Sequence, residues 1–256
     1  MIQQQFALKV KEVLEHDETI LGLAVAGSWL TDEIDEWSDL DLVVVTRENL
    51  NADKEKMMAY ANRFGNLLSG FTGEHVGETR LLICLYDEPL LHVDIKFVTA
   101  DEFRERIENP VLLLDRNNVL QDIIQSTKAS FPSPDFQWIE DRFWIWIHYG
   151  LQKIGRGEYF EALDFMGFLR MSVFGPLLHL RNNNLPRGVR KVETTLTAAD
   201  FKLLSGTIAI HEKESLLTAV YNATELYKSL RIDLYDDQVS LNKAEVAVMT
   251  YFSSLR

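Results

Sequence analysis

Two short apolar runs with polar residues between them constrain the fold more than any other part of the sequence. The first run, 21–26, is followed directly by glycine and serine, and the second, 42–45, follows Ser-Asp-Leu-Asp at 38–41. Both runs are rich in small or β-branched residues, which is typical of buried strands rather than of helices. The sequence therefore predicts two buried strands, with polar residues at the end of the first and at the start of the second.

Asp39 and Asp41 lie at the start of the second predicted strand. Because side chains alternate between faces along a strand, both carboxylates point to one side and Leu40 points to the other. Two adjacent carboxylates at the mouth of a buried strand repel each other and resist desolvation, so a cation between them stabilises the arrangement. Oxygen ligands on a rigid strand suit Mg²⁺, which takes substrate phosphates as its remaining ligands. The pattern predicts a magnesium site, and a solvated strand start without a ligand is the alternative.

Gly27 and Ser28 follow the first predicted strand. A glycine directly after a strand lets the backbone approach a ligand closely, and the serine adds a hydroxyl beside free backbone N–H groups. The pair is therefore predicted to bind a phosphate, and an ordinary turn is the alternative.

A third carboxylate, Asp94, lies in the segment 90–98, where His92, Asp94 and Lys96 alternate with apolar residues. The alternation predicts a long strand with one polar face. A charged residue in the middle of such a strand needs a partner. Asp94 is predicted to be the third acid of the site, and a salt bridge to Lys96 or to a neighbouring arginine is the alternative.

The charge balance bears on the substrate. The chain has 256 residues and a formal net charge of −13, and a surface that acidic repels phosphate backbones. Nucleic acid is therefore disfavoured as the main substrate, and a cationic small molecule is favoured. Four acids between the two strands add to this charge, although a solvated loop also explains them: Asp32, Glu33, Asp35 and Glu36.

The compartment expected from the sequence is the cytoplasm. No apolar run reaches the length of a membrane span, and the N-terminal segment 1–18 is polar and amphipathic rather than a signal peptide. The single cysteine, Cys84, allows neither a disulfide framework nor a cysteine zinc site.

The first half of the chain mixes predicted helices and strands. Apolar positions at helical spacing predict a helix over 2–16, and a cap at Asn51 or Asp53 predicts a second helix through about Leu68. Glycines then interrupt the chain before a predicted hairpin. The remaining predicted elements are strands at 80–86 and 90–98 and, after a capping box at Thr99, a helix to about Glu108.

The second half is predicted to be helical. A proline-containing segment marks the boundary, with Ser133 as the N-cap and Pro134 at the first position of a new helix. Apolar residues then recur at steps of three and four, and a further helix is predicted over 158–180. The sequence thus predicts an α/β (α+β) domain with a mixed sheet at 1–130 and an all-α helical bundle at 131–256.

The order of these features resembles the signature of the nucleotidyltransferases related to DNA polymerase β: a strand, Gly-Ser, a spacer, Asp-x-Asp and a second strand. The segment 156–159, Arg-Gly-Glu-Tyr, is similar to a helix turn of the bacterial lincosamide and aminoglycoside nucleotidyltransferases, which act in antibiotic resistance. The resemblance implies a nucleotidyltransferase domain followed by a helical bundle that binds the acceptor. It also implies an enzyme that transfers a nucleoside monophosphate, AMP from ATP, to a hydroxyl of a small acceptor and releases pyrophosphate.

The resemblance also assigns roles to individual residues. Asp39 and Asp41 are expected to hold two Mg²⁺ ions, and Asp94 is expected to complete the second metal site and to orient or deprotonate the acceptor hydroxyl. A homodimer with the active site between two subunits is compatible with this resemblance. The residues expected to contact the nucleotide are Gly27, Ser28, Ser38, Lys153 and Arg156.

Two other functions fit the same sequence. A nucleotidyltransferase of this kind can modify a protein or the end of an RNA, although the acidic surface disfavours RNA. A non-catalytic nucleotide sensor on the same fold is the third hypothesis. The presence of all three acids argues against a sensor, because a sensor need not keep them.

Overall fold

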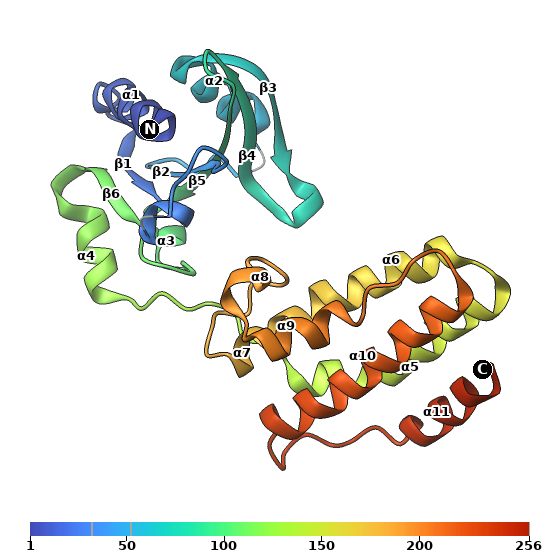
Figure 1. The fold of residues 1–256 in the computed structure, drawn as a ribbon. Coiled ribbons are helices and arrows are strands. Elements are labelled where there is room, and N and C mark those ends of the chain that lie inside the picture. The colour runs from blue at the N-terminus through green and yellow to red at the C-terminus, as the bar shows by residue number, and fades with distance from the viewer. Residues whose placement is uncertain (32, 52, 256) are drawn as a thin grey trace. The chain divides into compact units, whose positions relative to one another are not determined.

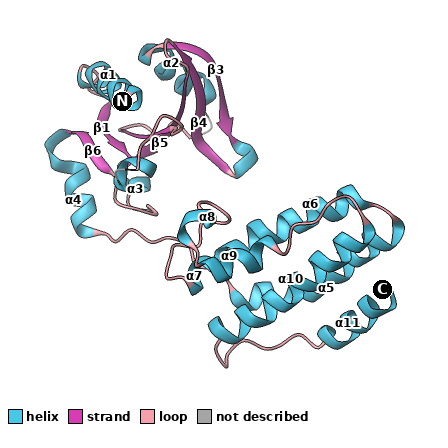
Figure 2. Ribbon diagram, viewed as in Figure 1, coloured by secondary structure: helices cyan, strands magenta, loops and turns pink. Residues whose placement is uncertain are grey.

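The computed structural model describes residues 1–31, 33–51 and 53–255. Contacts among these residues divide the chain into two compact units, Met1–Phe131 and Pro132–Arg256. The first unit combines a sheet with helices, and the second consists of helices and loops (Figures 1 and 2). The predicted fold class, an α/β domain with a mixed sheet followed by a helical region, is confirmed.

In the described part of the first unit, six strands form one sheet: β1 (Ile20–Val25), β2 (Leu40–Thr46), β3 (Asn66–Gly73), β4 (Glu78–Asp87), β5 (Leu91–Thr99) and β6 (Val111–Asp115). Their order across the sheet is β3-β4-β5-β2-β1-β6. Strand β2 runs parallel to β5, and the other neighbouring strands are antiparallel. The sheet is therefore mixed, with the parallel pair at its centre.

Helices cover both faces of this sheet: α1 (Ile2–Glu15), α2 (Lys54–Phe64), α3 (Ala100–Phe103) and α4 (Val119–Ser126). Val10 of α1 and Phe64 of α2 are fully buried in a core that they share with one face of the strands. Phe103 of α3 and Leu120 of α4 are buried in a second core on the other face. Each of these side chains contributes roughly 1.5–3 kcal/mol of burial energy.

Strand β2 shows how the alternation of side chains positions its polar residue. Leu40, Leu42 and Val44 are buried in the core beneath α1 and α2. Val45 packs in the core with α3 and α4. Asp41 has the same parity as Val45, so its carboxylate lies on the α3 and α4 side of the sheet.

The segment after α2 differs from the prediction. The helix begins at the predicted cap, where Asp53 Oδ1 accepts a hydrogen bond of 3.1 Å from the Lys56 N–H, but it ends at Phe64 rather than near Leu68. Leu68 lies instead in the edge strand β3, which pairs with β4. Backbone pairing with β4 outweighs the helical spacing of the apolar residues here.

The elements around the second core also differ from those that the sequence predicts. The capping box forms as predicted, because the Thr99 hydroxyl accepts from the Glu102 N–H at 3.2 Å and the Glu102 carboxylate accepts from the Thr99 N–H at 2.8 Å. The helix that it starts nevertheless ends at Phe103 rather than near Glu108. Helix α4 and strand β6 were not predicted from the sequence. Strand β6 pairs with β1, and α4 packs in the second core.

The second unit contains α5 (Phe136–Arg156), α6 (Tyr159–Leu169), α7 (Gly175–Arg181), α8 (Val192–Thr195), α9 (Ala198–Ser205), α10 (Lys213–Leu234) and α11 (Ala244–Leu255). The segment predicted as one helix over 158–180 comprises α6 and α7, with a π-helical turn at Arg170–Phe174 between them. The N-cap of α5 is Asp135 rather than Ser133. Asp135 Oδ1 accepts the Trp138 N–H at 2.9 Å, which satisfies one of the free donors at the start of the helix.

A buried carboxylate joins three segments of the helical unit. Glu140 of α5 is fully buried, and its Oε2 accepts a hydrogen bond of 2.5 Å from the Tyr227 hydroxyl of α10. Its Oε1 accepts bonds from the Asn242 N–H at 3.0 Å and from Arg231 at 3.3 Å. A charge at such a depth is stabilised by several partners, so these contacts tie α10 and the segment before α11 to α5.

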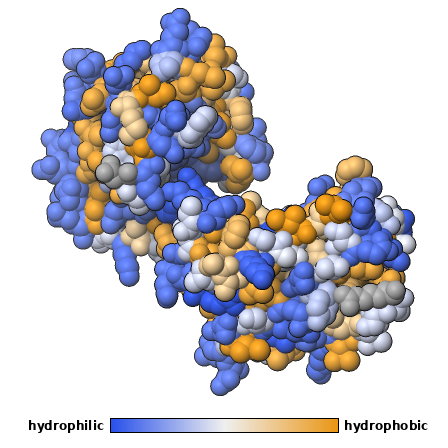
Figure 3. All heavy atoms as spheres, in the orientation of Figure 1, coloured by the Kyte–Doolittle hydropathy of each residue, from blue (hydrophilic) through white to orange (hydrophobic). Residues whose placement is uncertain are grey.

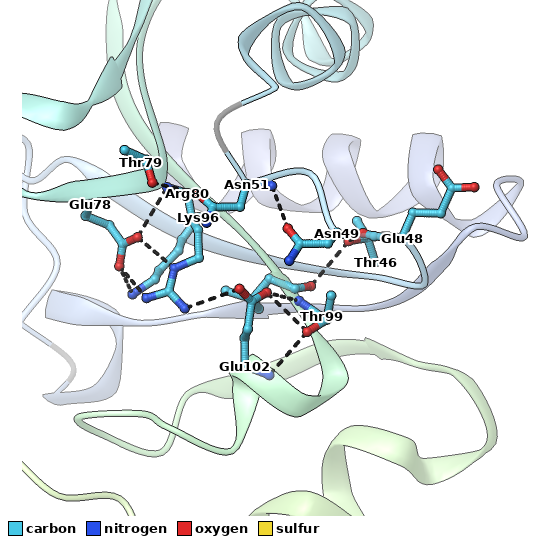
Figure 4. A network of polar contacts seen from close by, with 11 residues as sticks. Thr46, Glu48, Asn49, Asn51, Glu78, Thr79, Arg80, Lys96, Thr99 and Glu102 are labelled. Atoms are coloured by element: carbon cyan, nitrogen blue, oxygen red, sulfur yellow. Dashed lines mark hydrogen bonds and ion pairs between the residues drawn. The ribbon is translucent and has the colours of Figure 1, made fainter.

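A network of charged side chains spans β4, β5 and α3 in the first unit (Figure 4). Glu78 Oε1 accepts a hydrogen bond of 2.7 Å from Arg80 Nε, and Lys96 Nζ lies 2.7 Å from Glu78 Oε2. Arg80 also lies 3.7 Å from the Glu102 carboxylate of the α3 capping box. The hydrogen bond from Arg80, together with that from Lys96, lowers the pKa of Glu78 from 4.5 to about 2.

Replacement of Glu78 by glutamine is expected to destabilise the chain by about 2 kcal/mol at neutral pH. A pKa lowered by this amount corresponds to about 3 kcal/mol, and solvent screening at a partly exposed site reduces it. A lowered folded-state pKa stabilises the fold above the unfolded-state pKa, so the effect is lost as the pH falls from 4.5 to about 2. Urea denaturation of Glu78→Gln and wild type across this range measures it. The exposed Glu18→Gln is the control, and a difference that does not depend on pH would contradict the assignment.

The surface of each unit mixes hydrophilic and hydrophobic residues on the face drawn in Figure 3. None of the helices within the described ranges is both long enough and apolar enough to cross a membrane. Cys84 is buried in β4, where burial raises the pKa of its thiol to about 12.

Candidate active site

Two predicted site acids lie side by side on the central strands β2 and β5. Because these strands run parallel, Asp41 of β2 is paired in register with Asp94 of β5. Val93 and Ile95 of β5 are buried beneath α1 and α2, so Asp94 shares the opposite face with Asp41. Neighbouring strands are about 4.8 Å apart, which places the two half-buried carboxylates next to each other.

The turn after β1 brings Gly27 against Asp41. Gly27 has a φ of +65°, in the left-handed region that favours glycine. A Cβ atom at this position would overlap Oδ2 of Asp41 and lie 3.0 Å from its Cγ. The Ala26 N–H donates a hydrogen bond of 3.0 Å to the Asp41 carbonyl oxygen. Both the backbone conformation and the space taken by the carboxylate therefore require a glycine here.

The polar partner of Asp94 is a histidine rather than Lys96, with which a salt bridge was the alternative expected from the sequence. A hydrogen bond of 2.9 Å joins its Oδ1 to Nε2 of His92, whereas Lys96 pairs with Glu78. Burial raises the pKa of the Asp94 carboxyl, the hydrogen bond from His92 opposes this rise, and the negative charge of Asp39 adds to it. Asp39, which is half-buried, directly precedes Leu40, and Leu40 pairs with Val93 of β5, so the backbone of Asp39 comes close to the segment around Asp94.

The two predicted serines have different surroundings. Ser28 lies directly after Gly27 in a short 3-10 turn, Gly27–Thr31. Ser38 precedes the acids, and its hydroxyl donates to Asp35 Oδ1 at 2.8 Å and accepts the Asp35 N–H at 3.1 Å. The Ser38 side chain therefore stabilises the turn that leads into β2, and its contact with a nucleotide stays a prediction.

A fourth acid, Glu108, also contacts the turn at Gly27, and the sequence did not predict it as a site residue. Its Oε1 accepts a hydrogen bond of 2.9 Å from the Gly27 N–H. Glu108 precedes β6, whose first residue, Val111, pairs with Val25 at the end of β1. This pairing brings the two segments together, and no local pattern in the sequence signals it. The Gly27 N–H, expected to be free for a phosphate, thus has a carboxylate partner.

Lys153 and Arg156 belong to the helical unit, where both lie near the acids that start α6. Lys153 Nζ is 2.9 Å from Glu158 Oε2 and 3.0 Å from Glu161 Oε2. Hydrogen bonds to these two carboxylates raise the pKa of Lys153 and keep it protonated. Arg156 Nη1 lies 4.0 Å from Glu158 Oε1. Contact of these cations with a triphosphate stays a prediction.

The acids suit a hard divalent cation in their chemistry. Asp39, Asp41 and Asp94 offer carboxylate oxygens, and the raised pKa of Asp94 reflects burial and a like charge, both of which a cation would offset. Within residues 1–31, 33–51 and 53–255, no group of three or more His, Cys, Asp or Glu side chains has the geometry of a metal site. Asp94 Oδ1 is bonded to His92, and the second oxygen of this carboxylate remains as a candidate ligand for a cation.

Comparison with protein families identifies the class to which this arrangement belongs. Residues 8–128 match the sequence profile of the family described as nucleotidyltransferase domain. The matched segment contains the turn at Gly27 and the acids Asp39, Asp41 and Asp94. Residues 8–128 therefore contain a nucleotidyltransferase domain, as the Gly-Ser and Asp-x-Asp pattern predicts.

Solved structures resemble the chain at low sequence identity. An aminoglycoside 6-adenyltransferase from Bacillus subtilis is 14% identical with a TM-score of 0.42, covering 99% of this chain and 98% of its own. A nucleotidyltransferase-like protein from Exiguobacterium sibiricum is 13% identical with a TM-score of 0.38, covering 100% and 89%. A CCA-adding enzyme from Thermotoga maritima, solved with tRNA, is 13% identical with a TM-score of 0.32, covering 99% and 69%. Likenesses this distant do not identify the acceptor, and a search of curated proteins finds no match to the chain.

Proposed function

We propose that this chain transfers AMP from ATP to a hydroxyl group of a small cationic acceptor and releases pyrophosphate. The observation that carries the proposal is the pairing of Asp41 and Asp94 in register beside the Gly27 turn. This arrangement supports a site in which the carboxylates of the two central strands lie close to the phosphate chain of ATP. Mg²⁺ bound at the acids would neutralise the charge that develops on the transferred phosphoryl group and on the leaving pyrophosphate.

Asp39 and Asp41 would hold the metal ions, and Asp94 would orient the acceptor hydroxyl and take its proton. The hydroxyl oxygen forms a bond to the α-phosphorus, and the bond from that phosphorus to the bridging oxygen of the β-phosphate breaks. The position of Asp94 beside Asp41, on the strand that runs parallel to β2, supports this role.

The charge near the site supports a cationic acceptor. Glu33, Asp35 and Glu36 are exposed in the loop that leads to Asp39, while Asp32 lies outside the described residues. Trp37 in the same loop has 85% of its surface exposed, and an indole face attracts cations. Together with the net charge of −13, this loop favours an aminoglycoside-like or lincosamide-like amine over a nucleic acid. The helical unit, with Lys153 and Arg156, is proposed to bind the acceptor and the triphosphate.

Pyrophosphate release tests the proposal. Wild-type chain and Asp39→Asn are incubated with Mg²⁺, each of the four ribonucleoside triphosphates, and a panel of aminoglycosides and lincosamides. Release that requires one acceptor, prefers ATP and is lost in Asp39→Asn is expected. Metal-dependent ATP binding without release for any acceptor would contradict a small-amine acceptor. Mass spectrometry of a lysate incubated with Mg-ATP would then show whether a protein is modified instead.

A further inference from the structure

We infer that Glu108 occupies the place of a substrate phosphate oxygen on the Gly27 N–H, and that the triphosphate displaces it on binding. The inference rests on the proposed function, because it assumes that the Gly27 turn binds the phosphate chain. It adds a residue outside the predicted site, and assigns it control over the affinity for the triphosphate.

The geometry of the contact is that of an anion on a backbone donor. Glu108 Oε1 lies 2.9 Å from the Gly27 nitrogen, and the bond is partly buried. Carboxylate and phosphate oxygens accept such N–H bonds in the same way, with similar lengths. The amide predicted to bind a phosphate therefore already holds an anionic oxygen of the chain itself.

A phosphate and Glu108 exclude each other at this position. A single N–H donates its full strength to one acceptor, and two anionic oxygens brought to the same donor repel each other. Gly27 also lies against the Asp41 carboxylate, so a third negative group at this point adds to the repulsion. Binding of a triphosphate at Gly27 therefore requires the Glu108 carboxylate to leave.

The backbone of the surrounding loop is anchored on both sides of Glu108. Arg106 anchors the loop through hydrogen bonds to the carbonyl oxygens of Ile124 at 3.2 Å and Thr127 at 3.0 Å. Val111 begins β6, which fixes the loop at its other end. Glu108 itself is only half-buried, so its carboxylate can move away from the Gly27 N–H while the backbone stays in place.

Calorimetric titration of the full chain with inorganic tripolyphosphate, and separately with ATP, both in the presence of Mg²⁺, tests the inference. Glu108→Ala frees the Gly27 N–H, and its Kd for tripolyphosphate is expected to fall about tenfold, equivalent to about 1.4 kcal/mol. Glu108→Gln keeps a weaker, uncharged acceptor of the same size, and a smaller decrease in Kd is expected. Glu105→Gln removes one negative charge from an exposed position of the same segment and is expected to bind like wild type.

The outcomes separate the inference from the proposed function. If the wild type binds and neither Glu108 variant binds more tightly, the inference fails while the proposed function stands. A Kd that rises in Glu108→Ala and returns to the wild-type value in Glu108→Gln also overturns it, because the bond would then hold the turn in shape. If wild type and both Glu108 variants bind neither ligand, the two proposals fail together. Urea denaturation of each variant confirms that the fold is intact.

Discussion

Replacement of Asp41 by asparagine is expected to lower the rate of pyrophosphate release by about 10³-fold. Asparagine keeps the size of the side chain and its place beside Gly27, but it removes the negative charge that would hold a metal ion against the phosphate chain. Loss of one preorganised electrostatic group of this kind costs roughly 4 kcal/mol of transition-state stabilisation. The effect is expected on kcat, measured as pyrophosphate release at saturating ATP, while the free energy of unfolding changes little.

Asp101→Asn is the matched control for this prediction. The Asp101 side chain is almost fully exposed on α3, where it lies 3.5 Å from Arg104. It undergoes the same chemical change on the same side of the sheet, without contact with the Gly27 turn. Activity within about twofold of wild type in Asp41→Asn would remove Asp41 from the catalytic site. A large and equal loss in Asp101→Asn would show that the assay responds to general damage.

Replacement of Gly27 by alanine is expected to cost both activity and stability. A side chain at a φ of +65° costs about 1 kcal/mol of backbone strain. The new methyl group also overlaps the Asp41 carboxylate, which must turn away from its position. A displacement of about 1 Å in a catalytic group lowers the rate by about 100-fold, so a loss of this size is expected in pyrophosphate release.

Gly77→Ala separates the two causes. Gly77 has a φ of +76°, and a Cβ atom there meets no described atom within 4 Å. This variant is therefore expected to lose about 1 kcal/mol of stability, from the backbone strain that it shares with Gly27→Ala, and to keep wild-type activity. Equal activity in Gly27→Ala and wild type would show that the turn does not position Asp41. The double variant Gly27→Ala, Asp41→Asn is expected to lose much less activity than the product of the two single losses, because Gly27 and Asp41 act through one contact.

The sequence predicts those parts of the site that depend on local sequence patterns. Gly27 follows one short apolar run, and Asp39 and Asp41 precede another. An apolar run bounded by polar residues defines a buried strand and the position of its ends. The pairing of Asp94 with Asp41 depends on which strands are neighbours. The family resemblance supplied that information, whereas the alternation around Asp94 supplied only its face.

The features beyond the prediction depend on contacts between distant segments. Glu108 reaches Gly27 because β6 pairs with β1, and its own sequence surroundings resemble any polar loop. Strand β3 has the apolar spacing of a continued helix up to Leu68, and only the presence of β4 beside it selects the extended conformation. The cap of α5 moved from Ser133 to Asp135 for a local reason, since both residues can cap and the carboxylate is the one placed to reach the Trp138 N–H.

The order of the strands has a consequence for how the chain acquires activity. Gly27 and Glu108 are 81 positions apart, and the parallel pair β2 and β5 is joined by a connection that contains α2, β3 and β4. Contacts over such separations form slowly, because the loop must be closed before the contact stabilises it. A ribosome-bound chain that ends before β6 contains Asp39 and Asp41 but lacks the strand whose pairing with β1 brings Glu108 to Gly27. The proposed control of triphosphate affinity by Glu108 would therefore be among the last properties to appear as the first unit folds.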